Sequence, residues 1–154
     1  MVRAPVYVVV SGPPGSGKTT LARALAVELH LPLVAKDTVK EALMRHLAVP
    51  DVETSRRLGS AWHRTYAILE LRALPGELLE VFCRCDPAVA EQRYRDRAAT
   101  RAPGHFDGKR SAAELANDEV SRPVAGGWPV VETDTTGPVD IVEVVARLRA
   151  ATAG

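Results

Sequence analysis

The segment Gly12–Thr19 constrains this chain more than any other part of its sequence. It reads Gly-Pro-Pro-Gly-Ser-Gly-Lys-Thr, which fits the pattern G-x-x-x-x-G-K-[ST] without a mismatch. It lies between a run of β-branched and aromatic residues, Val6–Val10, and a stretch in which leucine recurs every four residues, from Leu21 to Leu29. This order of strand, loop and helix is the context that the motif needs, so a chance glycine-rich turn is a weak alternative.

Each residue type in this loop has a physical task in binding a nucleoside triphosphate. Glycines let the backbone curl so that successive N–H groups point at phosphate oxygens, and the following helix adds its free N–H groups and dipole. Lys18 would place a positive charge on the β- and γ-phosphates, and the Thr19 hydroxyl would coordinate Mg²⁺. We therefore expect ATP and Mg²⁺ as cofactors. The residues expected to contact ATP here are Gly12, Pro13, Pro14, Gly15, Ser16, Gly17, Lys18, Thr19 and Thr20.

The composition is typical of one globular domain. A chain of 154 residues suits a single domain over 1–154. Its net charge of +1 gives no electrostatic reason to expect nucleic acid or an anionic membrane as a partner. Cys83 and Cys85 are expected to be reduced, buried strand residues, because they lie in an apolar run and a disulfide at that spacing has poor geometry. No signal peptide or membrane span is evident, so we expect a cytoplasmic protein, whose oligomeric state the sequence does not indicate.

Strand and helix signals alternate along the chain. Continuous apolar runs predict buried strands at Val6–Val10, Leu31–Ala35, Leu78–Cys85 and Pro129–Thr133. Helices are predicted after the phosphate loop, from Asp37 or Thr38 to Pro50, from Asp51 or Thr54 to Pro75, after Asp86-Pro87, over a short stretch from Ser111, and from Pro138 onward. This alternation predicts an α/β fold with three layers, α/β/α, and a mainly parallel sheet.

With this loop, its helix and several later Asp and Arg positions in view, the chain resembles the small bacterial P-loop kinases. Within them it is most similar to chloramphenicol phosphotransferase-like and zeta-toxin-like proteins, often called AAA-family ATPases. The resemblance covers nearly the whole chain, although only Gly12–Thr19 is highly specific. It implies a P-loop NTPase fold of the nucleoside- and nucleotide-kinase type, and transfer of the γ-phosphate of ATP to a hydroxyl of a small molecule. A regulatory module that binds ATP without an acceptor remains an alternative, whereas the near-neutral charge argues against a kinase of nucleic-acid ends.

The resemblance also assigns roles to three charged side chains. Asp37 matches the carboxylate that orients or deprotonates the attacking hydroxyl, and the alternative is a helix N-cap. Arg93 and Arg97 match two arginines four residues apart, a spacing that puts both on one helix face. Arg93 would stack on adenine and Arg97 would reach the phosphates; the alternative is a solvated basic face paired with Glu91 and Asp96. The catalytic residues are thus expected to be Lys18, Asp37 and Arg97.

Two loops complete the expected site. By the resemblance, residues 134–138 line the adenine pocket through Thr135 and Gly137, although an ordinary strand-to-helix turn is an alternative. Residues at about 98–120 fall where the family has a mobile lid, with Arg101 as a candidate lid arginine and His105 more simply a surface residue. Two aromatic residues on the predicted helix before Pro75 belong either to the core or to the acceptor pocket: Trp62 and Tyr66.

The chain departs from the family pattern in one place. The family has a third strand before Leu79, and that strand ends in a carboxylate which supports Mg²⁺. Residues 64–75 are helical in pattern throughout and contain no such run. Either the protein lacks this strand, which argues against catalysis, or the sequence as given omits a segment of the chain somewhere within 64–77. We favour the second interpretation, which predicts two consecutive Cα atoms there much further apart than about 3.8 Å.

Overall fold

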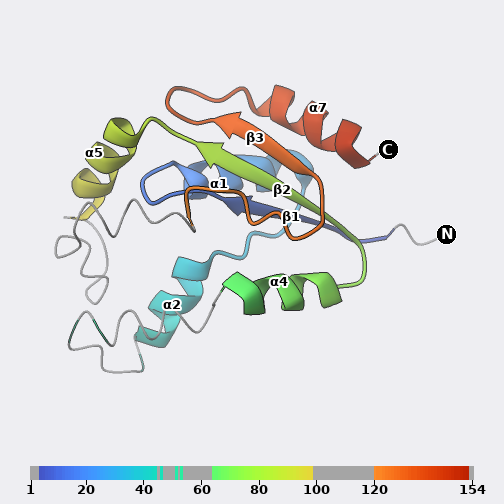
Figure 1. Cartoon of the computed structure of the whole chain (residues 1–154), viewed down its shortest axis with the longest axis horizontal. Coiled ribbons are helices and arrows are strands. Elements are labelled where there is room, and N and C mark those ends of the chain that lie inside the picture. The colour runs from blue at the N-terminus through green and yellow to red at the C-terminus, as the bar shows by residue number, and fades with distance from the viewer. Residues whose placement is uncertain are drawn as a thin grey trace.

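The computed structural model describes residues 4–44, 46, 51, 53, 64–98 and 120–152. Three parallel strands form a sheet in the order β1-β2-β3: β1 (Val6–Ser11), β2 (Glu77–Arg84) and β3 (Val130–Asp134). The helices are α1 (Lys18–Leu29), α2 (Lys36–Met44), α4 (Arg64–Ala73), α5 (Pro87–Ala98) and α7 (Ile141–Thr152). Figure 1 shows the strands running toward the end of the molecule where α5 lies, with both termini at the opposite end. The predicted α/β fold with a parallel sheet is confirmed.

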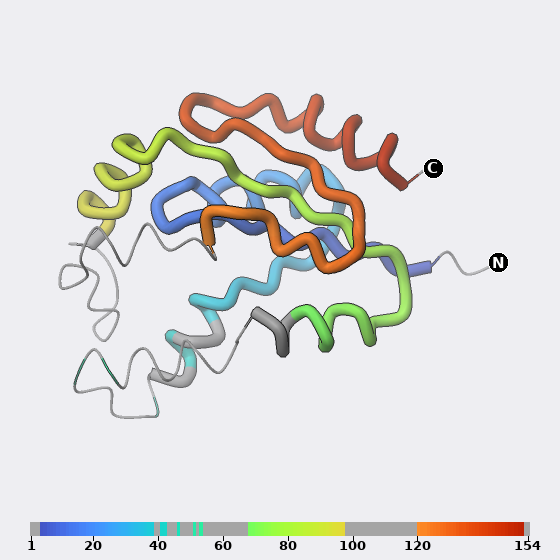
Figure 2. The backbone as a smooth tube through the Cα atoms, in the orientation of Figure 1, coloured from blue at the N-terminus to red at the C-terminus, as the bar shows by residue number. Residues whose placement is uncertain are grey.

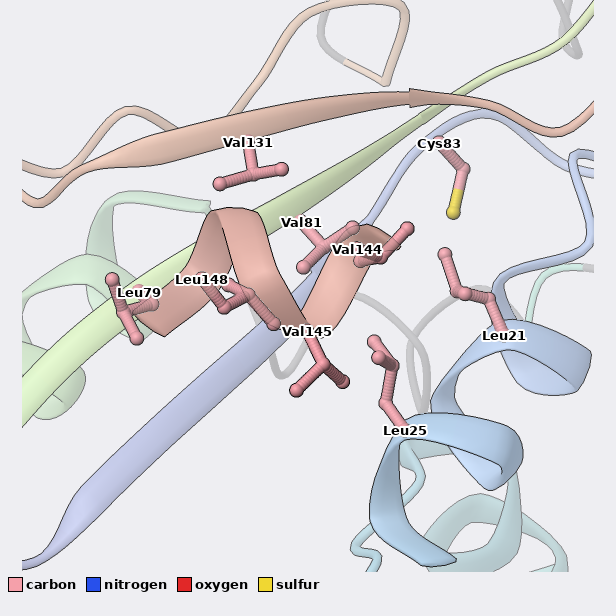
Figure 3. Close-up of a cluster of buried hydrophobic side chains, with 9 residues drawn as sticks. All are labelled: Leu21, Leu25, Leu79, Val81, Cys83, Val131, Val144, Val145 and Leu148. Carbon is pink, nitrogen blue, oxygen red and sulfur yellow. The ribbon is translucent and has the colours of Figure 1, made fainter. Parts of the chain in front are cut away.

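Helices α1 and α7 cover one face of the sheet and form the core with it. Alternate residues of β2 point to this face, since side chains of a strand alternate between its two sides. Figure 3 shows their side chains meeting those of the two helices. The buried cluster comprises Leu21, Leu25, Leu79, Val81, Cys83, Val131, Val144, Val145 and Leu148. Burying each of the larger aliphatic side chains contributes about 1.5–3 kcal/mol, so this cluster fixes the positions of α1 and α7 on the sheet.

The central strand is β2, and β1 lies at an edge. Residues Leu79–Cys83 are buried on both faces of β2, as their continuous apolar run predicts. The expectation that β1 is equally buried is wrong, because all six of its residues are only partly buried. Among the described residues β1 pairs with β2 alone, so its other edge has no neighbouring strand. The segment 123–128 lies against the face of β2 opposite the core.

The predicted strand at Leu31–Ala35 does not form. A strand exists only when a neighbour completes its hydrogen-bond ladder, and no described strand lies next to this segment. Its side chains are therefore left in solvent: Leu33 is 43% exposed and Val34 is 83% exposed. The apolar run instead connects α1 to α2 outside the sheet.

The predicted break within 64–77 is also wrong. Residues 64–73 form the single helix α4, and the Leu74 amide donates to the Leu71 carbonyl at 3.1 Å as that helix ends. The chain then enters β2 directly, and Figure 2 shows the backbone tube continuing from α4 into β2. Glu77 N donates to Pro5 O at 2.9 Å, which starts the pairing of β1 with β2. A strand with a terminal carboxylate is thus absent between α4 and β2.

Two predicted helices need smaller corrections. Helix α2 begins at Lys36, so Asp37 lies inside its first turn and is not the N-cap. On α4, which the sequence predicts as part of a longer helix from Asp51 or Thr54 to Pro75, the apolar residue Leu69 is 59% exposed. Three predicted features lie wholly or largely outside the described residues. They are the remaining parts of the predicted helices before Pro75, the short helix from Ser111 and the expected lid at about 98–120. No helix seen in the described ranges has the length and apolarity needed to span a membrane.

Candidate nucleotide-binding site

The phosphate loop follows β1 at the carboxyl edge of the sheet, where parallel α/β folds bind ligands. Three glycines take positive φ angles that other residues avoid: Gly12 at 141°, Gly15 at 78° and Gly17 at 83°. A turn forms within the loop because Ser16 N donates to Pro13 O at 3.2 Å. The predicted curled backbone is therefore present, and the glycines stand where its conformation requires them.

The loop passes directly into the amino end of α1. The helix starts after Gly17, and Leu21 N donates to Gly17 O at 3.0 Å as its first hydrogen bond. Gly17 has no side chain that could accept hydrogen bonds from the first amides, as Ser or Asp would in most helices. An anion can take that place, and the positive end of the helix dipole favours it. Thr19 and Thr20 lie exposed in this first turn.

Lys18 is folded back over the loop. Its Nζ donates to Pro13 O at 2.6 Å, which places the ammonium group on the loop itself. A bound phosphate would offer this cation a stronger, charge-assisted partner than a neutral carbonyl. The curled backbone, the uncapped helix end and this lysine together form a donor set that fits a polyphosphate.

The Ser16 side chain is sealed beneath the loop, next to the end of β2. Its Oγ is fully buried and makes no hydrogen bond of good geometry within the described part of the chain, although it lies close enough to Cys83 to affect that thiol. Burial raises the pKa of the Cys83 thiol to about 11, with the nearby Lys18 charge acting in the opposite direction. Cys83 is therefore a protonated core residue at neutral pH, as expected, and not a reactive thiolate.

The shifted thiol predicts a pH dependence of stability. An unfolded Cys83 would lose its proton near its ordinary pKa of 9.0, whereas the folded protein retains that proton up to about 11. The free energy of unfolding should thus fall as pH rises across this window, by about 1–2 kcal/mol for this group. Urea unfolding of Cys83→Ala should show a smaller loss over that range than the unchanged protein. Cys85→Ala is the control and should keep the full loss; equal slopes in all three proteins would contradict the prediction.

Arg93 on α5 joins the phosphate loop to the loop after β3. Its Nη1 donates to Thr135 O at 2.7 Å and its Nη2 donates to Thr136 O at 2.7 Å. The same Nη1 lies 4.0 Å from where a β-carbon on Gly17 would be. Three predicted contact residues, Gly17, Arg93 and Thr135, are thus brought together. In this arrangement the guanidinium group holds loop carbonyls, and its stacking on adenine stays a prediction.

The loop after β3 is held firmly at its first residues. Thr135 is buried, and its N and Oγ1 donate to Arg84 O at 2.7 and 2.8 Å. Thr136 N donates to Asp134 Oδ1 at 2.9 Å, and hydrogen bonds from Thr136 hold the pKa of the Asp134 carboxyl below its usual value. Gly137 is exposed, and a β-carbon added there would meet nothing within 4 Å, so the chain has an open side at this point.

Helix α5 starts as predicted and carries the second arginine. Asp86 Oδ1 accepts hydrogen bonds from Ala88 N at 2.9 Å and Val89 N at 3.2 Å, which confirms its role as N-cap. Arg97 lies over the Tyr94 ring, with its Cζ 5.6 Å from the ring centroid. Glu91 and Asp96, the carboxylates suggested as partners of Arg93 and Arg97, contact other side chains. Arg95 forms an ion pair with Glu91, and Gln92 Nε2 donates to Asp96 Oδ1 at 2.8 Å.

The structure gives less support for the predicted catalytic base and for the predicted Mg²⁺ ligand. Asp37 is half-buried in the first turn of α2, and its role as a base stays a prediction. Within the described ranges no three His, Cys, Asp or Glu side chains gather closely enough to hold a metal ion. Mg²⁺ usually keeps several waters and binds through phosphates and one or two protein groups, so it needs no such cluster, and the role of Thr19 as its ligand stays a prediction.

Sequence reasoning missed two residues that shape this site. The Ala90 carbonyl lies only 1.9 Å from where a β-carbon on Gly15 would be, so α5 packs directly against the loop. Thr136 Oγ1 accepts a hydrogen bond from Asp86 N at 2.9 Å and ties the start of α5 to the loop after β3. Nothing in the sequence marks Ala90, whereas Thr136 lies in the segment 134–138, in which only Thr135 and Gly137 were predicted as contact residues.

A separate hollow lies at the opposite, amino end of the strands. It has a volume of about 580 Å³ and is bordered by Arg72 from α4, Trp128 from the segment before β3, and the end of α7. It is open to solvent and lies far from the phosphate loop along β2. It is therefore not the nucleotide site.

The parallel sheet with a glycine-rich loop and lysine at its carboxyl edge defines the class of protein: an α/β P-loop NTPase. The sequence matches the AAA domain family over residues 8–76. A solved candidate kinase of Chloroflexus aurantiacus J-10-fl has a TM-score of 0.73 and is 27% identical, with 99% of this chain and 98% of that chain covered. A gluconokinase of Sinorhizobium meliloti 1021 has a TM-score of 0.53 at 22% identity, with 99% and 94% covered, which shows the shared fold.

One curated relative adds a local match. The chain is 47% identical over 51 residues to a cytidylate kinase of Pyrobaculum neutrophilum, covering 33% of this chain and 28% of that enzyme. The chain thus matches only a little over a quarter of the relative's length. Together with the structural similarity, these matches agree with the α/β P-loop NTPase fold that the resemblance of the sequence predicted.

Proposed function

We propose that this protein transfers the γ-phosphate of ATP to a hydroxyl group of a small molecule. The observation that carries the proposal is the phosphate loop itself, which leads into the uncapped amino end of α1 and holds the Lys18 ammonium against its own backbone. Phosphoryl transfer depends mainly on positioning and on charge stabilisation, and this is the chemistry that such a donor set supplies. The similarity to a solved candidate kinase supports the same function.

The proposed roles of the side chains follow the charge of the reaction. Lys18 neutralises the β- and γ-phosphates, and Arg97 on α5 adds a second positive charge. Mg²⁺, held by Thr19 and the phosphates, supplies further charge neutralisation when bound. Asp37 orients the acceptor hydroxyl or takes its proton. Arg93, Thr135 and Gly137 form the wall proposed for adenine.

A regulatory module that binds or hydrolyses ATP without an acceptor is the second candidate. One observation favours it: no strand with a terminal carboxylate lies beside β1 in the described residues, although kinases of this type use one to support Mg²⁺. In both cases ATP is the ligand. For the kinase we propose a small-molecule acceptor and a cytoplasmic location.

An assay of ADP release separates the two candidates. The purified protein is incubated with MgATP alone and with each member of a panel of sugars, amino alcohols, nucleosides and nucleoside monophosphates. The kinase hypothesis predicts that at least one acceptor raises ADP release and yields an equal amount of phosphorylated product. Asp37→Asn should lower that rate by about 100-fold, while Thr38→Ala, at the next position of α2, should not.

ADP release that no acceptor changes, with free phosphate as the only product, would favour the regulatory module. A protein that binds no ATP in either condition would contradict both candidates. If Asp37→Asn phosphorylates the acceptor at the full rate, the kinase hypothesis stands, but Asp37 has no role in catalysis.

A further inference from the structure

Glu80 is a charged residue at the centre of the sheet. It lies midway along β2 and is fully buried, with none of its surface exposed. Among the residues whose side-chain burial the structure describes, no other Asp, Glu, Lys or Arg is buried. A charged side chain is expensive to bury unless hydrogen bonds compensate it, so its partners reveal why it is there.

Four donors surround the Glu80 carboxylate. Its Oε1 accepts hydrogen bonds from Ser11 Oγ and from Val124 N, the latter at 2.6 Å. Its Oε2 accepts from Ala125 N at 2.8 Å and from Trp128 Nε1 at 3.2 Å. None of these four donors carries a charge. The carboxylate is therefore held by dipoles from two parts of the chain, β1 and the segment before β3.

The segment before β3 is shaped around this carboxylate. Two successive amides, those of Val124 and Ala125, point at it in the manner of a backbone anion nest. Ala125 takes a φ of 48°, a conformation that costs a non-glycine residue about 1–2 kcal/mol. The Trp128 ring lies against Gly126, where a β-carbon would come within 2.2 Å of it. Charge-assisted hydrogen bonds offset the strain, so the turn depends on Glu80.

The other donor lies at the entrance of the phosphate loop. Ser11 is the last residue of β1 and immediately precedes Gly12. There is little free space at this point, because a β-carbon on Gly12 would lie 2.8 Å from Cys83 O and 2.9 Å from Ser16 Oγ. A shift of Ser11 would therefore be passed on to the loop.

We propose that Glu80 is a positioning residue for the phosphate loop. Its carboxylate connects the turn at 124–128 to Ser11, so that the fit of Trp128 in that turn sets the position of Gly12 and the affinity for nucleotide. This inference rests on the proposed binding of ATP to the loop. This role differs from a purely structural one because changes at Ser11 and at Trp128 must both alter the affinity for nucleotide, and must do so through the same connection.

A double-mutant cycle tests the connection without removing the buried carboxylate, whose loss would leave four donors unsatisfied. The variants are Ser11→Ala, Trp128→Phe and the two together, and the readout is the dissociation constant of a non-hydrolysable MgATP analogue by calorimetry. Each single variant should weaken binding about 3–10-fold. The two effects should not add: the double variant should bind as tightly as the single variant with the lower affinity. Thr152→Ala, which removes a hydroxyl at the end of α7, is the control and should bind normally.

Amide hydrogen exchange of residues 12–17 without nucleotide gives a second, independent readout. Trp128→Phe should speed exchange of these amides, although they lie in a different segment from the mutated residue. Additive losses of affinity, or lowered unfolding stability with neither affinity nor loop exchange changed, would overturn the inference and leave Glu80 a structural residue. If the unchanged protein binds no nucleotide, the proposed function fails, and the exchange experiment still decides whether the connection exists.

Discussion

Replacing Lys18 by alanine is expected to lower phosphoryl transfer by at least about 100-fold while the fold remains intact. The ammonium group would act on phosphate oxygens in the transition state, and removal of one such electrostatic contact typically costs about 10²–10³-fold in rate. In this structure Lys18 Nζ donates to Pro13 O, and loss of a hydrogen bond made by a charged group costs about 1.5–3 kcal/mol, which is less than the stability of a typical domain. Steady-state kinetics with the acceptor found in the panel would measure the effect.

The matched control is Arg23→Ala, which removes an exposed positive charge from the same helix, on the turn after Lys18. It should leave kcat/KM within about twofold, because a solvent-screened charge contributes little. Circular dichroism and thermal unfolding of both variants separate a local effect from misfolding. Undiminished transfer by Lys18→Ala would reject the assignment of this loop as the phosphate site.

Gly15→Ala is expected to cause the largest loss of stability of any single methyl addition in the loop. The new β-carbon would lie 1.9 Å from the Ala90 carbonyl oxygen, and the backbone φ is 78°. The clash is with backbone, so no side chain can rotate to relieve it. Overpacking and the left-handed conformation together predict a loss of about 2–5 kcal/mol, with nucleotide binding lost as α5 is pushed away. Urea unfolding and calorimetric titration of MgATP would measure the two effects.

Gly137→Ala provides the control for this prediction. The same methyl group meets nothing within 4 Å there, and the residue does not require a positive φ. Its unfolding free energy should stay within about 0.5 kcal/mol of the unchanged protein. Equal stability of the two alanine variants would show that α5 does not pack on the loop as described.

The parts of the fold that were predicted correctly depend on local signals. The phosphate loop, the cap at Asp86 and the buried run of β2 each follow from residues that are neighbours in sequence. Glycine, an aspartate before proline and a continuous apolar run have the same local consequence in most contexts. The recurrence of leucine every four residues likewise predicted a helix, and two of these leucines, Leu21 and Leu25, are buried in the core.

The errors concern strands whose state depends on distant neighbours. Leu31–Ala35 has the composition of a strand, but no strand among the described residues pairs with it. Strand β1 is apolar, but only one described strand, β2, pairs with it. Whether such a segment joins a sheet is decided by chain far away in sequence, which local pattern cannot show. The gap predicted within 64–77 would have held a further strand beside β1, and the continuous path of the chain from α4 into β2 contradicts it.

The candidate site was predictable where a motif defines it and unpredictable where tertiary contacts do. Lys18 and Thr19 follow from the pattern. That Arg93 would hold the Thr135 and Thr136 carbonyls does not, since it depends on how α5 meets the loop after β3. Glu80 carried a visible signal, a charge within an otherwise apolar strand, yet its partners come from residues 44 to 69 positions away.

The most direct test of this account is a titration of the ¹⁵N-labelled protein with MgATP, followed by amide NMR. The account predicts saturable shifts that are largest for the amides of Gly15 to Thr19, and their loss in Lys18→Ala. Inorganic triphosphate should shift the same amides, because the loop recognises the phosphates and not the base. Shifts centred on other residues, or an unchanged spectrum at millimolar MgATP, would contradict the claim that this loop holds a nucleotide.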